Sequence, residues 1–180
     1  MGVTHRRARR SGPALALVAA GLVLLGACSG DAGTLDQAAT QRAVGKAVGA
    51  QVDAKVTATS CEEPIDREEG ATFACEVTLK GAGDLPVTVT QVDGGGKLDV
   101  KPDAAVVTRE RLASELKASL KEQFERSFQV ACDDDPAVAV RKPGSTSTCI
   151  ARDATSRRTV TVTVTDPAGT LAFAVGKATG

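Results

Sequence analysis

The chain has 180 residues, with 22 Lys and Arg against 22 Asp and Glu, one His, five Cys and no Trp or Tyr. A net charge of zero argues against a nucleic-acid-binding protein, and aromatic residues, at 2%, are too few to build stacking platforms for bases, sugars or flat cofactors. Because 42% of the residues are apolar, we expect a folded chain around an aliphatic core.

The N-terminal segment joins a basic start to a short apolar run. Residues 1–10 hold four Arg and no acid, and the apolar run 14–25 is too short for a permanent membrane-spanning helix. The sequence Leu25-Gly26-Ala27-Cys28 follows and resembles a bacterial lipobox, in which small residues precede a lipidated cysteine. This order predicts a lipoprotein signal peptide at 1–27 and lipidation of Cys28.

Two other interpretations of this segment stay open, an ordinary secretory signal with a coincidental Cys and an uncleaved anchor. The Arg pairs also fit the twin-arginine export route. If Cys28 is lipidated, acyl chains such as palmitate would tie the protein to the outer face of the cytoplasmic membrane, through a short polar tether at 28–34. The rest of the chain would then lie in the cell envelope, an oxidising compartment.

The remainder of the chain reads as a duplication with an offset near 73 residues. Two tandem domains are predicted, 35–103 and 104–180. The matching segments are Val87–Asp93 with Val160–Asp166, Gly70–Cys75 with Gly144–Cys149, and Cys61–Pro64 with Cys132–Pro136.

Each repeat begins with a helical pattern. In the first, Val44, Val48 and Val52 form a thin apolar stripe after a possible N-cap at Thr34 or Thr40, and two internal glycines weaken the helix. In the second, Thr108 is the expected N-cap. The longer stripe of this helix comprises Leu112, Leu116, Leu120, Phe124 and Phe128.

After each helix the apolar residues alternate, which predicts strands. Turns at Asp93–Gly96 and Asp166–Gly169 would join each long Val-Thr strand to a final strand. The expected fold class is therefore α+β, with an N-terminal helix packed on an antiparallel meander of about four strands in each domain. Residues 101–107 would connect the two repeats.

The cysteines beyond Cys28 are four, and four cysteines allow three pairings. A bond that belongs to the repeated unit stays inside it, which predicts the disulfides Cys61–Cys75 and Cys132–Cys149. The competing interpretation is a metal site or a redox pair. It lacks both a Cys-x-x-Cys motif and a His after residue 5.

These residues also resemble a known family. A Val-rich lead to Cys, then Pro, Gly-x-x-Phe-x-Cys and a Val-Thr strand is similar to the actinobacterial domain-of-unknown-function family 4333. The resemblance covers Val56–Val100 and, as a divergent second copy, Val130–Val175, where Ser147 replaces Phe73. It implies an exported, membrane-anchored protein with one cysteine pair per domain, and no assigned reaction.

Few residues offer chemistry. With His5 inside the predicted signal peptide, no Ser-His or Cys-His nucleophile system can form in the mature chain. Carboxylate pairs for glycoside cleavage are conceivable in an acidic loop, although a solvated loop is the simpler interpretation. The acids of that loop are Glu62, Glu63, Asp66, Glu68 and Glu69.

A second acidic run, Asp133–Asp135, could bind Ca²⁺ but lacks the spacing of a calcium loop. No catalytic residue, cofactor or metal is therefore expected. Charge divides unevenly, since residues 28–105 are net acidic and residues 106–180 slightly basic. A preference of the second half for anionic polymer or phospholipid headgroups follows as a hypothesis. Its basic residues include Arg141, Lys142, Arg152, Arg157 and Arg158.

The sequence thus predicts a non-catalytic, lipid-anchored envelope lipoprotein with a binding or interaction role. Its expected partners are the membrane, through the lipid, and an envelope protein or polymer, with no nucleic acid. Two alternatives are an enzyme or enzyme accessory that acts on cell-wall polymer, and a structural spacer.

Overall fold

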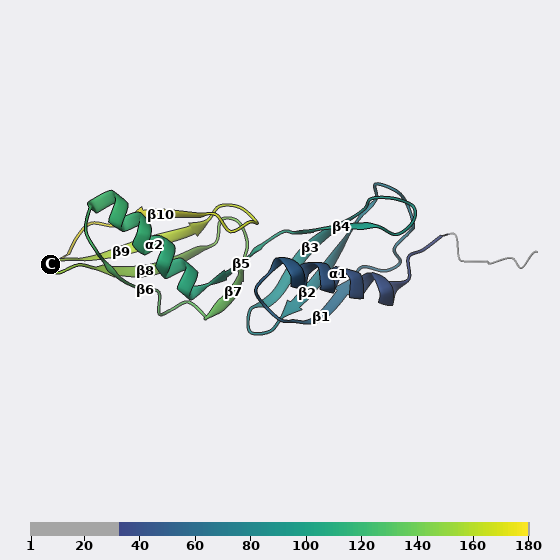
Figure 1. Ribbon diagram of the computed structural model, residues 1–180, viewed down its shortest axis with the longest axis horizontal. Coiled ribbons are helices and arrows are strands. Elements are labelled where there is room, and N and C mark those ends of the chain that lie inside the picture. The colour runs from purple at the N-terminus through teal and green to yellow at the C-terminus, as the bar shows by residue number, and fades with distance from the viewer. Residues whose placement is uncertain (1–32, 180) are drawn as a thin grey trace, which may run out of the picture. The chain divides into compact units, whose positions relative to one another are not determined.

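The computed structural model describes residues 33–179 (Figure 1). The predicted signal peptide and Cys28 lie outside these residues. Within them, no helix is long and apolar enough to cross a membrane. The helices and strands follow the α+β order that the sequence predicts, with a helix laid along an antiparallel sheet twice in succession.

The first helix, α1 (Gln37–Gln51), begins one residue after its N-cap Asp36, whose Oδ1 accepts a hydrogen bond from the Ala39 amide at 2.6 Å. The expected cap at Thr34 or Thr40 is wrong, because Thr40 is buried inside the helix and Thr34 pairs with Asp66 in an isolated bridge. Val44 and Val48 are fully buried, as the apolar stripe predicts.

Gly45 is unfavourable for the helix by its intrinsic propensity, but its small size allows α1 to pack closely on β1. A Cβ built at this position would lie 2.6 Å from Thr59 Oγ1, so a larger residue would force the Thr59 side chain or the helix to shift. The intrinsic cost of glycine in the helix, about 1 kcal/mol, is therefore offset by tighter packing on the sheet.

The first sheet is a meander of β1 (Val56–Cys61), β2 (Thr72–Leu79), β3 (Gly83–Gln91) and β4 (Leu98–Pro102), in the order β1-β2-β3-β4. Alternate residues of these strands are buried together with Val44 and Val48 of α1. They include Phe73, Cys75, Val77, Leu79, Leu85, Val87 and Val89. Strand alternation thus directs one face of the sheet towards the helix.

The second repeat opens with β5 (Ala105–Thr108), followed by α2 (Arg109–Phe124). Thr108 caps α2 as predicted, since its Oγ1 accepts from the Arg111 amide at 3.1 Å. The remaining strands are β6 (Gln129–Ala131), β7 (Val138–Arg141), β8 (Thr146–Arg152), β9 (Arg157–Val164) and β10 (Leu171–Val175). Four of them form the second sheet, in the order β10-β9-β8-β6.

Leu112, Leu116 and Leu120 of α2 are buried in one cluster with the inward residues of β8 and β9. The helix ends at Phe124, before the predicted stripe does, and Glu125 takes a left-handed conformation (φ 53°). Phe128 is buried beyond this end, with its ring edge-on to Phe124 at 5.7 Å between centroids.

One part of the expected layout needs correction. Residues 101–107 are not merely a connection, because β5 pairs antiparallel with β7 in a separate two-stranded sheet. The cysteine loop of the second repeat thereby contributes a strand, β7, to a sheet that the first repeat does not have.

Both predicted disulfides are present, Cys61–Cys75 and Cys132–Cys149. Cys61 and Cys75 are direct partners in the β1–β2 register, whereas Cys132 follows β6 and joins it to β8. Closing loops of this size stabilises a fold by roughly 3 kcal/mol in the loop-entropy model. This matters for repeats whose cores contain few aromatic rings.

Candidate functional site

The acidic loop of the first repeat does not form a catalytic pair. Glu62, Glu63, Asp66, Glu68 and Glu69 are all exposed. Of these acids, only Glu63 lines the adjoining hollow of about 450 Å³, together with Leu35, Pro64 and Ile65. Glycoside cleavage needs a pair of carboxyl groups of which one is desolvated, and none of these five exposed acids is desolvated.

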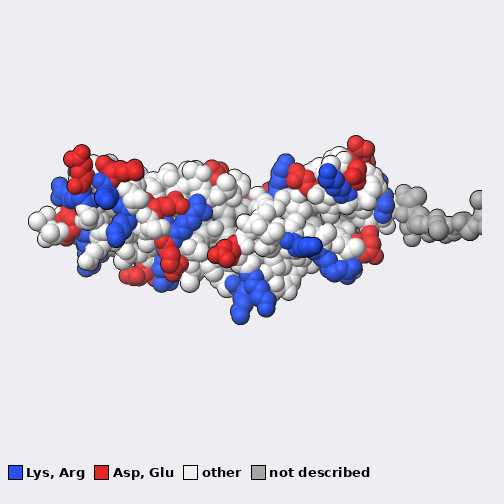
Figure 2. All heavy atoms as spheres, in the orientation of Figure 1, with Lys and Arg blue, Asp and Glu red and all other residues white. Residues whose placement is uncertain are grey.

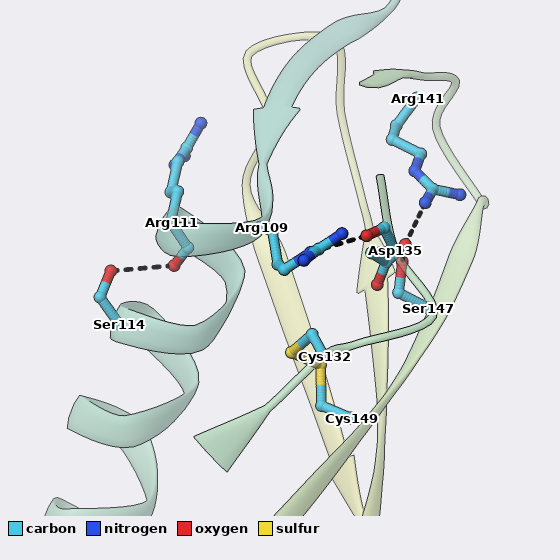
Figure 3. Close-up of a disulfide and its surroundings, with 8 residues drawn as sticks. All are labelled: Arg109, Arg111, Ser114, Cys132, Asp135, Arg141, Ser147 and Cys149. Carbon is cyan, nitrogen blue, oxygen red and sulfur yellow. Dashed lines mark hydrogen bonds and ion pairs between the residues drawn. A yellow bond between two sulfur atoms is a disulfide. The ribbon is translucent and has the colours of Figure 1, made fainter. Parts of the chain in front are cut away.

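The second acidic run divides at its last residue. Asp133 and Asp134 are exposed, whereas Asp135 is 6% exposed and turns inwards. Its Oδ1 accepts hydrogen bonds from Arg141 Nη2 and from Ser147 Oγ, the latter at 2.9 Å (Figure 3). The run therefore consists of two solvated acids and a third, Asp135, that forms an ion pair with Arg141. Within residues 33–179, no group of acids, His or Cys could hold a metal ion.

Arg109 completes the polar cluster above the Cys132–Cys149 disulfide. Its Nε donates to the Asp135 carbonyl at 2.7 Å, and its side chain points towards Asp135 in Figure 3. Asp135 Oδ2 and Arg141 Nε are buried without a hydrogen-bond partner among the described residues. The cluster thus fastens the start of the cysteine loop to α2 through Arg109 and to β7, in the same loop, through Arg141, but the pairing is incomplete.

The first repeat fastens its cysteine loop differently, through Gln91. This side chain is 1% exposed; its Oε1 accepts from the Glu68 amide at 3.2 Å and its Nε2 donates to the Asp66 carbonyl at 2.7 Å. Sequence reasoning missed Gln91. The available signal was a polar residue at an inward position of a strand whose other inward residues are Leu85, Val87 and Val89.

Each sheet also has an open face, defined here as the face opposite its helix. On the second sheet this face carries Thr146, Thr148, Ile150 and Arg152 of β8 and Arg157, Thr159, Thr161 and Thr163 of β9. On the first sheet it carries Thr72, Ala74, Glu76, Thr78, Asp84, Pro86, Thr88, Thr90, Asp99 and Lys101. All these side chains are exposed or half-buried.

The two open faces differ in charge. The strands of the first sheet contain Glu76, Asp84 and Asp99 against Lys101, which pairs with Asp99 at 3.2 Å. The strands of the second sheet contain Arg152, Arg157 and Arg158 and no acid. Figure 2 shows basic and acidic side chains interspersed on the face it displays, so the charge separation is local to the sheets.

Three aspartates stabilise turns. Backbone hydrogen bonds, first from Lys97, lower the pKa of Asp93, and hydrogen bonds from Thr170 lower that of Asp166 at the equivalent turn of the second repeat. The largest effect falls on Asp153 between β8 and β9. Hydrogen bonds from the Thr155 amide and from Ser156 hold its pKa well below the usual range of a carboxyl group.

Comparison with known proteins supports the family resemblance for the first part of the chain. Residues 18–94 match the family model described as Domain of unknown function (DUF4333). No curated protein matches the chain. No solved structure matches it either. The match covers the first helix and most of the first sheet, and it assigns no activity.

Proposed function

We propose that the protein is a lipid-anchored lipoprotein of the cell envelope, with a non-catalytic binding role. The observation that carries the anchor is the order of basic residues, apolar run and Leu25-Gly26-Ala27-Cys28 at the start of the chain. A thiol at Cys28 is the acceptor that lipidation requires, and cleavage before it would remove residues 1–27. The mature chain then begins with its lipid anchor.

The two disulfides support export, because such bonds persist in oxidising compartments. The tether at 28–34 leaves only a few residues between the lipid and α1. The folded part would therefore stay close to the outer face of the cytoplasmic membrane, within reach of envelope components.

A binding role suits the side chains available. The polar clusters around Gln91 and Asp135 hold loops, and they carry no activated nucleophile or general base. The open faces of the two sheets, by contrast, present hydroxyl groups and charge to the surroundings.

The anchor is tested by metabolic labelling with an alkyne analogue of palmitate and mass spectrometry of the N-terminal peptide. We expect label on a mature chain that begins at Cys28 and partitions with membranes. Cys28→Ser keeps the basic and apolar parts of the signal and removes only the acceptor, so it should take up no label. Label on the Cys28→Ser variant, or an unlabelled chain that retains residues 1–27, would contradict the proposal.

A further inference from the structure

The second sheet carries two arginines in a position that sheets normally avoid. Arg152 of β8 and Arg157 of β9 are direct partners in the register, so their side chains leave the open face side by side. Like charges at directly opposite positions destabilise a pair of strands. Because this pair costs stability, it suggests a role for the two arginines other than stabilising the sheet.

Neither arginine is neutralised by its surroundings. Both side chains are exposed, and within residues 33–179 neither guanidinium takes part in an ion pair or a side-chain hydrogen bond. The nearest acid in sequence, Asp153, is committed elsewhere: its side chain is 5% exposed, its Oδ1 accepts from Thr155 and Ser156, and its Oδ2 pairs with Arg126 at 3.1 Å.

Arg158, the next residue, shows that the exposure of the pair is specific. It points to the opposite face, where its guanidinium lies over the Phe124 ring at 4.8 Å. Of the three arginines in this sheet, one is therefore used in packing and two are left to solvent on the open face.

Further polar groups surround the pair. Gln129 of β6 is the register partner of Arg152 on its other side, which gives a row Gln129–Arg152–Arg157 across three strands. Arg152 and Gln129 also line a surface hollow of about 550 Å³ with Lys117, Ser127 and Asp153, and the carboxylate of Asp153 is paired with Arg126. Arg152 and Lys117 thus line the same hollow, and Arg157 lies beside Arg152 in the register.

Along the rest of the open face the side chains are small and mostly hydroxylated. The register pairs Thr148 with Thr161 and Thr146 with Thr163, and no Asp or Glu lies on these strands. The strands of this face therefore carry no acid and many hydroxyl donors and acceptors, with positive charge at one end.

We propose that this row binds an oxyanion carried by a hydroxyl-rich anionic polymer, such as a phosphorylated or carboxylated polysaccharide, whose chain lies along the threonines. The site deepens the binding role proposed above and rests on it. Arginine forks match phosphate and carboxylate geometry, and threonine hydroxyls exchange hydrogen bonds with sugar hydroxyls.

Charge complementarity favours this occupant over two others. A membrane surface usually engages a protein through apolar or aromatic side chains beside the cations, and this face has Ile150 as its only large apolar residue among the described strands. A second copy could offer the acidic open face of the first sheet, but one of its three acids, Asp99, is already neutralised by Lys101.

The test uses the full chain, purified in neutral detergent, and three fluorescent probes: dextran sulfate, polygalacturonate and neutral dextran. Arg152→Gln with Arg157→Gln is compared with a matched double variant, Arg67→Gln with Lys142→Gln, which removes the same charge from exposed positions off this face. Loss of two charge-assisted hydrogen bonds predicts binding of both anionic probes at least tenfold weaker in the first variant. The matched variant should change less than twofold, and neutral dextran should not bind.

A third variant separates binding from folding. Arg157→Thr removes the repulsion and continues the threonine pattern of β9, so it should raise the melting temperature while it weakens polymer binding. An unchanged or lower melting temperature together with weak binding would mean that the arginine serves the fold.

Three outcomes would overturn the proposal: equal losses in the two double variants, binding to phosphatidylglycerol vesicles but to neither polymer, or self-association that Glu76→Arg abolishes. The assay reads polymer binding whether or not Cys28 is lipidated. A negative binding result would therefore not contradict the lipid anchor, and a negative labelling result would not contradict the polymer-binding site.

Discussion

The two repeats fold alike but fasten their cysteine loops by opposite means. In the first, Ile65 and Phe73 pack in the hydrophobic core. The neutral side-chain amide of Gln91 bonds the loop backbone through both its oxygen and its nitrogen. In the second, Ser147 stands in place of Phe73 and Val164 in place of Gln91. There the ion pair of Asp135 and Arg141 joins the start of the loop to β7, and Arg109 of α2 bonds the Asp135 carbonyl.

This difference shows what the fold requires and what it tolerates. Both solutions support a helix on a sheet with one disulfide, so the topology does not depend on either side-chain set. In the first repeat, the buried amide oxygen and nitrogen of Gln91 both have hydrogen-bond partners. In the second, Asp135 Oδ2 and Arg141 Nε are buried without a partner among the described residues. Burying charges costs solvation that pairing only partly returns, so the second repeat should be the easier one to disrupt.

The largest expected effect comes from breaking the ion pair. Asp135→Ala should lower the free energy of unfolding by about 2 kcal/mol, because Arg141 would keep its charge without its carboxylate. The loss stays below that for a fully buried pair because Arg141 is 23% exposed. Urea unfolding followed by circular dichroism measures it.

A matched variant and a double replacement sharpen this prediction. Asp134→Ala removes the same charge from an exposed neighbour and should change stability by less than about 0.5 kcal/mol. Asp135→Leu with Arg141→Met replaces the pair by apolar groups and should recover most of the loss. Equal effects of the changes at 134 and 135 would show that the ion pair contributes nothing.

The repeating patterns made the framework of the fold predictable. Periods of four and of two located the helices and long strands, and the duplication selected the disulfides from three pairings. These signals succeed because burial of one face imposes them along a whole element. The N-cap of α1 was missed because Asp36 and the two threonines are all good capping residues, and only packing decides among them.

The features that distinguish the repeats could not be predicted in the same way. Three consecutive aspartates look equivalent in sequence, and the path of the cysteine loop alone turns Asp135 inwards. The pairing of β5 with β7 joins two short segments about 30 residues apart without a turn signal between them. Arg152 and Arg157 were visible as basic residues, but their opposition depends on the register set by the turn at 153–156.

A smaller loss of stability is expected when the hydrogen bonds of Gln91 to the cysteine loop of the first repeat are removed. Gln91→Val places in the first repeat the residue that the second has at position 164. It leaves the Glu68 amide and the Asp66 carbonyl without their side-chain partners and should cost about 1–2 kcal/mol. Because the loss is local, trypsin should also cleave faster after Arg67 in the folded state.

Thr90→Val is the matched control, since it makes the same replacement at the adjacent, half-buried position on the open face. It should leave both the urea midpoint and the cleavage rate nearly unchanged. A Gln91→Val variant as protease-resistant as Thr90→Val would mean that the loop is held by its backbone bonds and the disulfide alone.

The smallest expected effect concerns the turn between β8 and β9, where the second repeat has an aspartate that the β2–β3 turn of the first repeat lacks. Asp153 receives hydrogen bonds from Thr155 and Ser156, which hold its pKa well below the usual value, and it pairs with Arg126. A carboxyl group whose pKa is lower in the folded state stabilises the fold above its unfolded pKa, near 3.9, and loses that contribution as the pH falls through the folded value. Asp153→Asn should therefore be less stable than the natural chain at pH 7, and the difference should shrink steadily from about pH 5 downwards. Urea midpoints at successive pH values give the result, with Asp93→Asn as the comparison in the first repeat, where a weaker lowering of the pKa predicts a smaller change. A difference that stays constant with pH would mean that Asp153 acts through its shape in the turn and not through its charge.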